Sequence, residues 1–100
     1  MAKNRDLQGF AYEKITVSGT AVGGTVGTYA PTDHPRAKSA LITTETNSIR
    51  IKYHGGAATA AEGHLLAAGA SFRVDGAASI AAISMIATGA DAAVHITYER

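Results

Sequence analysis

Apolar and polar residues alternate in several short stretches of this chain, a period typical of β-strands with one buried face. The clearest case is residues 92–98, where Val94, Ile96 and Tyr98 share one side and polar residues fill the other. Ile49, Ile51 and Tyr53 form a similar stripe. The pattern therefore predicts strands in both places, each with one buried face.

Two further strand pairs are predicted from the residues between these stripes. Residues 40–46 are rich in apolar and β-branched side chains, and we expect this strand to meet the one at 49–53 in a turn at 46–48. Leu65 and Leu66 lead through Gly69 to Phe72 and Val74, which alternate with polar residues. A strand pair around Gly69 is the prediction there.

The first strand, residues 10–17, changes its alternation phase along its length. Phe10 and Tyr12 are in one phase and Ile15 and Val17 in the other, and a β-bulge near Glu13 and Lys14 would reconcile them. The glycine-rich stretch 18–27 and the polar stretch 31–36 read as loops.

Residues 77–88 fit two kinds of element. Ile80, Ile83 and Ala87 match a helical stripe, and alanine favours helices. The turn-like residues 88–91 instead suit a hairpin joining a strand at 83–87 to the last strand, and we prefer the strand. With at least six short strands and glycine turns, the predicted class is an all-β antiparallel sandwich or barrel.

Composition changes this picture in one respect, because the core is thin. The chain has 100 residues, and its 46% apolar residues include many alanines and only four Tyr and two Phe. Burying a Leu or Ile side chain contributes about 1.5–3 kcal/mol, whereas alanine contributes little. Contacts with further subunits would add to such a core, and we expect a homo-oligomer, either a dimer or a trimer.

The net charge and the absence of cysteine limit the classes of partner and chemistry that we expect. A formal net charge of +1 gives no general attraction to nucleic acid or to anionic membranes, so neither is an expected partner. The chain has no cysteine, which removes disulfides and thiolate chemistry and leaves the redox compartment open. The polar start predicts neither a signal peptide nor a membrane span.

The residues that could carry chemistry do not have the spacing that known catalytic, nucleotide-binding or metal-binding motifs require. Gly19, Gly23, Gly24 and Gly27 match neither a dinucleotide fingerprint nor a Walker loop. The four histidines, at positions 34, 54, 64 and 95, show no short ligand spacing, although a cupin-like metalloenzyme could gather them in space. Serines lack a nucleophile-elbow context and acidic residues are scattered. We expect no catalytic residue, no metal and no cofactor.

Basic residues are the remaining candidates for a binding surface. Arg36, Lys38, Arg50 and Lys52 lie in the middle of the chain, and the last two share a strand face. Such charges are either a solvated outer face or a contact to an acidic protein surface.

Four segments, in this order, resemble the small jelly-roll decoration (cement) proteins of tailed bacteriophage capsids. The matching residues are Ala37-Lys38-Ser39-Ala40-Leu41-Ile42, Ile49-Arg50-Ile51-Lys52-Tyr53, Gly63-His64-Leu65-Leu66-Ala67-Ala68-Gly69-Ala70-Ser71-Phe72 and Ala90-Asp91-Ala92-Ala93-Val94-His95-Ile96-Thr97-Tyr98. The alanines around 57–61 and 77–82 depart from the family's pattern. The resemblance implies a single antiparallel jelly-roll sandwich over residues 10–100.

The resemblance also implies a function and a partner. It implies a non-catalytic virion protein, made in the host cytoplasm, that sits on the capsid exterior, binds across neighbouring major capsid subunits and stabilises the shell. Residues 1–9 are expected to form an arm in which Lys3, Arg5 and Leu7 contact the capsid or a neighbouring subunit. Alternatives are a head-completion or tail-associated virion protein and a sugar-binding β-sandwich module.

Overall fold

The computed structural model describes residues 7–32 and 35–100. Its elements in chain order are β1 (Gly9–Val17), α1 (Val26–Tyr29), β2 (Ser39–Thr46), β3 (Ile49–Lys52), β4 (His64–Leu66), β5 (Ser71–Asp75), α2 (Ala77–Ala81), β6 (Ser84–Ala87) and β7 (Ala92–Glu99). The strands form two antiparallel sheets, so the predicted all-β sandwich class is confirmed.

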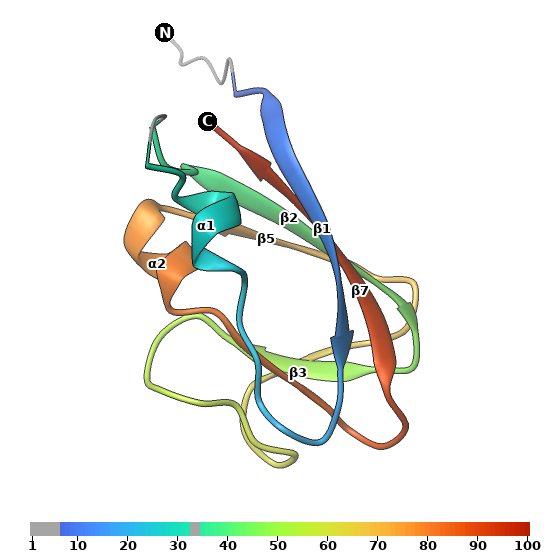
Figure 1. Ribbon diagram of the computed structural model, residues 1–100. Coiled ribbons are helices and arrows are strands. Elements are labelled where there is room, and N and C mark those ends of the chain that lie inside the picture. Colours follow the sequence, from blue (N-terminus) through green and yellow to red (C-terminus); the bar gives the residue numbers. More distant parts are fainter. Residues whose placement is uncertain (1–6, 33–34) are drawn as a thin grey trace, which may run out of the picture.

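The strands labelled in Figure 1 belong to two sheets, with β1, β7, β2 and β5 in the larger one and β3 in the smaller one. The larger sheet has the order β1-β7-β2-β5, and the smaller one has the order β4-β3-β6. The first and last strands of the described chain are neighbours, because β1 pairs with β7 along nearly its whole length. Neither helix in the described residues is long and apolar enough to cross a membrane.

The core lies between the sheets and is built from the predicted stripes. Val94, Ile96 and Tyr98 of β7 are fully buried, as are Ile49 and Ile51 of β3. The inward faces alternate with half-buried outward residues on both strands, as the period of two requires. The predicted facing of the last strand is therefore confirmed.

The irregularity of β1 lies earlier than predicted. The register against β7 shifts between Gly9 and Ala11, not at Glu13 and Lys14. From Ala11 onward the strand alternates without interruption, so Glu13 points inward with Val17 while Tyr12 is exposed. The bulge moves Phe10 out of phase, and this explains the mixed pattern of the sequence.

Residues 77–88 contain both of the elements that the sequence allowed. Ala77–Ala81 is a short helix with Ile80 buried, so the preferred strand is wrong for this half. Ser84–Ala87 is a strand with Met85 and Ala87 buried. Alanine propensity decides the first half, and the pairing of β6 with β3 decides the second.

Three predicted hairpins are absent from the described chain, although their strands exist. β2 and β3 flank the turn at Thr46–Ser48 but belong to different sheets, and the same holds for β4 with β5 and for β6 with β7. Asn47 adopts a left-handed φ of 62° at the first of these crossings. Each turn carries the chain from one sheet to the other.

Most of the predicted arm, residues 1–6, lies outside the described residues. Lys3 and Arg5 lie outside the part of the chain that the structure describes. Gly9 already belongs to β1, and Gln8 exchanges backbone hydrogen bonds of 3.2 and 3.1 Å with Arg100. Backbone pairing with the last residue of the chain is therefore present from Gln8, and the two ends of the described chain lie together (Figure 1).

Candidate binding site

A hollow of about 500 Å³, open to solvent, lies beside the end of β3 and the start of β4. Side chains of several chemical types surround it. The residues that line it are Lys52, Tyr53, His54, Glu62, Gly63 and His64. Because the smaller sheet ends at this point, the hollow is built from strand ends and from the loop between them.

Three rings meet at the edge of the hollow. The centroids of Tyr53 and His64 are 5.8 Å apart with the rings 19° from parallel, and His64 lies 5.9 Å from Phe72 at 27°. Tyr53 and Phe72 are also 5.8 Å apart. Tyr53 is in the same alternation phase as the buried Ile49 and Ile51. Because it lies just past the end of β3, its ring is not fully covered and is 37% exposed.

The basic side chains of β3 shape the loop that forms one wall of the hollow. Arg50 donates from Nε to the carbonyl of Ala60 at 3.2 Å and from a terminal nitrogen to the carbonyl of Gly63 at 3.1 Å. Lys52 donates to the carbonyl of Gly55 at 3.0 Å. Arg50 and Lys52, both predicted to be interface residues, thus make hydrogen bonds to the loop of their own chain.

The other predicted interface residues that the structure describes are Leu7, Arg36 and Lys38, and each lies just before a strand of the larger sheet. Arg36 and Lys38 are exposed immediately before β2, and Leu7 is half-buried. The backbone of Lys38 bonds to Glu99 and to Gly76. The structure therefore does not bring Arg36 and Lys38 onto the same sheet as the basic residues of β3.

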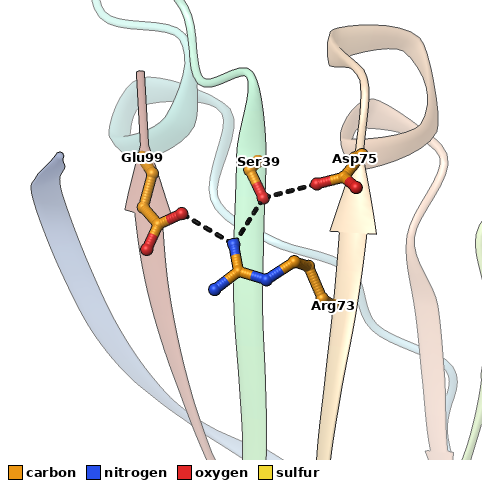
Figure 2. Close-up of polar contacts among 4 residues, drawn as sticks. All are labelled: Ser39, Arg73, Asp75 and Glu99. Atoms are coloured by element: carbon orange, nitrogen blue, oxygen red, sulfur yellow. Dashed lines mark hydrogen bonds and ion pairs between the residues drawn. The ribbon is translucent and has the colours of Figure 1, made fainter. Parts of the chain in front are cut away.

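A polar row crosses three strands of the larger sheet near Lys38 (Figure 2). Arg73 donates to Glu99 at 2.7 Å and to the hydroxyl of Ser39 at 2.8 Å, and Ser39 donates to Asp75 at 2.7 Å. The hydrogen bond to Glu99 raises the pKa of Arg73. Ser39 is fully buried, so this row supplies the partners its hydroxyl needs and links β7, β2 and β5.

A second polar row on the larger sheet joins residues that are far apart in sequence. The hydroxyl of Tyr12 bonds to Nδ1 of His95 at 2.5 Å, and Nε2 of His95 bonds to Glu45 at 2.8 Å. The hydrogen bond from His95, then the charges of His95 and Lys14, lower the pKa of Glu45. The Glu45 carboxylate orients the His95 imidazole. Tyr12 and the Glu45 side chain are each 57% exposed, so this row lies on an open face of the sheet and not in a pocket.

A carboxylate at the inner side of β1 fastens the loop before α1. Glu13 accepts hydrogen bonds from the amide and hydroxyl of Thr25, at 3.0 and 2.7 Å, and from the hydroxyl of Tyr98 at 2.6 Å. Burial raises the pKa of Glu13, but these three bonds outweigh it and hold the pKa below 4.5. Burial and the bond to Glu13 raise the pKa of Tyr98 far above its ordinary value.

The histidines are divided between two regions. His54 and His64 line the hollow, His95 lies on the larger sheet, and His34 is outside the described residues. Within residues 7–32 and 35–100, no group of three His, Asp or Glu side chains is placed to hold a metal ion.

Comparison of the chain with protein-family models, with curated proteins and with solved structures finds no match. The site is therefore defined by its own geometry.

Proposed function

We propose that this chain is a non-catalytic virion protein of a tailed bacteriophage, with a jelly-roll fold, that decorates the capsid exterior. Its partner would be the major capsid protein, bound across neighbouring subunits, and the chain itself would assemble as a dimer or trimer. A ligand that binds only the assembled shell stabilises that shell by mass action.

The order of strand pairing is the observation that carries the proposal. Val22 forms an isolated bridge with Met85 of β6, and it can be counted as a vestigial strand between β1 and β2. Eight strand positions then pair first with eighth, second with seventh, third with sixth and fourth with fifth. A long antiparallel hairpin rolled upon itself pairs in this nested way, which supports a jelly roll of eight strands.

The segments that resemble decoration proteins coincide with strands of this pairing scheme. Residues 37–42 enter β2, residues 49–53 form β3 in the opposite sheet, and residues 63–72 run from β4 across to β5. Residues 90–98 form most of β7. The family's order of a basic-apolar strand, a facing strand and an apolar turn into a third strand is thus compatible with the fold.

The end of the sandwich that carries both termini is the surface we assign to the capsid. Arg36 and Lys38 are exposed there, next to the start of β2, and Gln8 and Arg100 pair nearby. Basic side chains at this end would meet acidic groups on the shell. Lys3 and Arg5, which belong to the same predicted interface, lie outside the described residues.

The first test is a copy count by quantitative mass spectrometry of purified virions of the phage that encodes the chain. Decoration requires a number of copies comparable to that of the major capsid protein. A handful of copies per particle would favour the head-completion or tail-associated role, and absence from the virion would overturn the proposal.

The second test is co-sedimentation with capsids that lack the protein. The double variant Arg36→Glu, Lys38→Glu should lose binding and its salt dependence. Lys14→Glu, an equally exposed reversal on β1, is the matched control and should bind normally. Equal binding by both variants would remove the assigned surface.

A further inference from the structure

We propose that the hollow beside Tyr53 is a carbohydrate-binding site that takes a β-linked hexose unit. This function is separate from capsid binding and does not depend on it. The hollow combines a fixed aromatic surface, a loop held by hydrogen bonds, mixed hydrogen-bonding groups and a suitable size.

The aromatic surface is held in place before any ligand arrives. Tyr53 is backed by His64 and Phe72, each with its ring centroid 5.8 Å away. Phe72 comes from β5 in the larger sheet, so this ring cluster bridges the two sheets. A ring fixed in this way loses little conformational freedom on binding, which favours ligands with a flat apolar face.

The loop that lines the hollow at Glu62 and Gly63 is fixed by Arg50 and by a glycine. Arg50 binds the carbonyls of Ala60 and Gly63, so the loop cannot swing away without losing both hydrogen bonds. Gly63 has a φ of +134°, and a Cβ there would lie 3.1 Å from Cβ of Arg50 and 3.2 Å from the amide nitrogen of Ile51. Only glycine lets the backbone pass this close to β3.

The polar groups of the hollow suit hydroxyls rather than a single charge. Lys52 donates only, the Glu62 carboxylate accepts only, and His54, His64 and the Tyr53 hydroxyl can do either. Sugar hydroxyls both donate and accept. A hexose with equatorial hydroxyls offers these groups at its rim and axial C–H groups on its face, which matches a polar rim around an exposed ring.

The size of the hollow suits a small ligand, and its charge does not favour a nucleic acid. A volume of about 500 Å³ lies in the usual range for small-ligand sites and accommodates one or two hexose units. The hollow is lined by one basic residue, Lys52, and one acidic residue, Glu62, and the formal net charge of the chain is only +1, so phosphates gain little attraction there. Base stacking on Tyr53 therefore lacks electrostatic support.

The test is titration of the whole chain with cellohexaose and with chitohexaose, followed by NMR. We expect saturation transfer to the axial protons of the sugar and shift changes confined to residues that line the hollow. Tyr53→Ala should weaken binding at least about tenfold. His54→Ala and Glu62→Ala change exposed side chains, so they test the site even if Tyr53→Ala fails to fold.

Tyr12→Ala is the matched control, because Tyr12 is exposed on the other sheet and should leave sugar binding unchanged. Failure of both oligosaccharides to bind would overturn the proposal. Binding that survives all three changes in the hollow would do the same, as would preferential binding of oligothymidylate there. Capsid co-sedimentation of Glu62→Ala should remain normal, which separates this site from the capsid surface.

Discussion

Removing the hydroxyl of Tyr98 tests the buried link between the last strand and the loop before α1. Tyr98→Phe deletes the 2.6 Å hydrogen bond to Glu13 and keeps the ring in the core. Glu13 retains its two bonds from Thr25. The variant therefore isolates one bond to a charged acceptor.

The expected loss follows from the charge and exposure of Glu13. A hydrogen bond to a charged group contributes about 1.5–3 kcal/mol to stability. Because Glu13 is only half-buried, water replaces part of the lost bond, and we expect the lower end, about 1.5 kcal/mol. For a domain of this size that corresponds to a fall in Tm of about 6–12 °C.

The assay is thermal and urea unfolding of both proteins across a pH series. The lowered pKa of Glu13 means that its carboxylate stabilises the fold fully above the ordinary value of 4.5, and that this stability is lost as pH falls through the lower folded-state value. The difference between the two proteins should therefore narrow at acid pH.

Tyr12→Phe is the matched control, since it removes a tyrosine hydroxyl from an exposed hydrogen bond and should cost less than about 0.5 kcal/mol. Equal melting of Tyr98→Phe and the unchanged chain at neutral pH would refute the reasoning. So would a difference that stays constant down to acid pH, because the acceptor would then not be the ionised carboxylate.

Four further outcomes are expected. Ile96→Ala should destabilise by about 2–5 kcal/mol and Thr97→Ala by less than about 1 kcal/mol, and equal melting points would contradict their opposite facing. Gly23→Ala should destabilise, since its Cβ would lie 2.5 Å from a backbone carbonyl oxygen, whereas Gly19→Ala meets open space and should not; matched melts would be inconsistent with that packing. A chain starting at Leu7 should melt like the full chain but bind capsids more weakly, and full binding would show that the sandwich alone carries the interface. A chelator should leave the melting point unchanged, and metal analysis should find less than one equivalent of metal per chain. One equivalent of a bound transition metal would instead favour the cupin-like metalloenzyme.

Alternation predicted the facing of strands but not their partners. The stripe of Val94, Ile96 and Tyr98 depends only on burial of one side, which any sandwich provides. The turns at 46–48 and 88–91 have residues that serve equally in a hairpin or in a crossing between sheets. The choice is made by distant pairing, above all that of β7 with both β1 and β2, which no local window contains.

The candidate site was missed because its residues come together only through the loop. His54 and His64 are far apart for a ligand motif, and Phe72 belongs to another sheet. Tyr53 is the one usable signal in the sequence, since it extends the apolar stripe of Ile49 and Ile51 to the residue just after β3, shortly before Gly55 and Gly56. Arg50 lies on the outward face of its strand, as the alternation predicts. The sequence does not predict the course of the loop that brings the carbonyls of Ala60 and Gly63 to its side chain.

The pairing of β1 with β7 also bears on how the chain folds during synthesis. Residues near position 9 pair with residues near position 99, which are synthesised about ninety residues later. The larger sheet is therefore incomplete until β7 has left the ribosome. Mean sequence separation between contacts is correspondingly high, and such topologies fold in about milliseconds to seconds rather than microseconds. Until β7 is available, the nine residues of β1 lack their partner strand, and unpaired strand residues of this kind are open to mispairing with other chains.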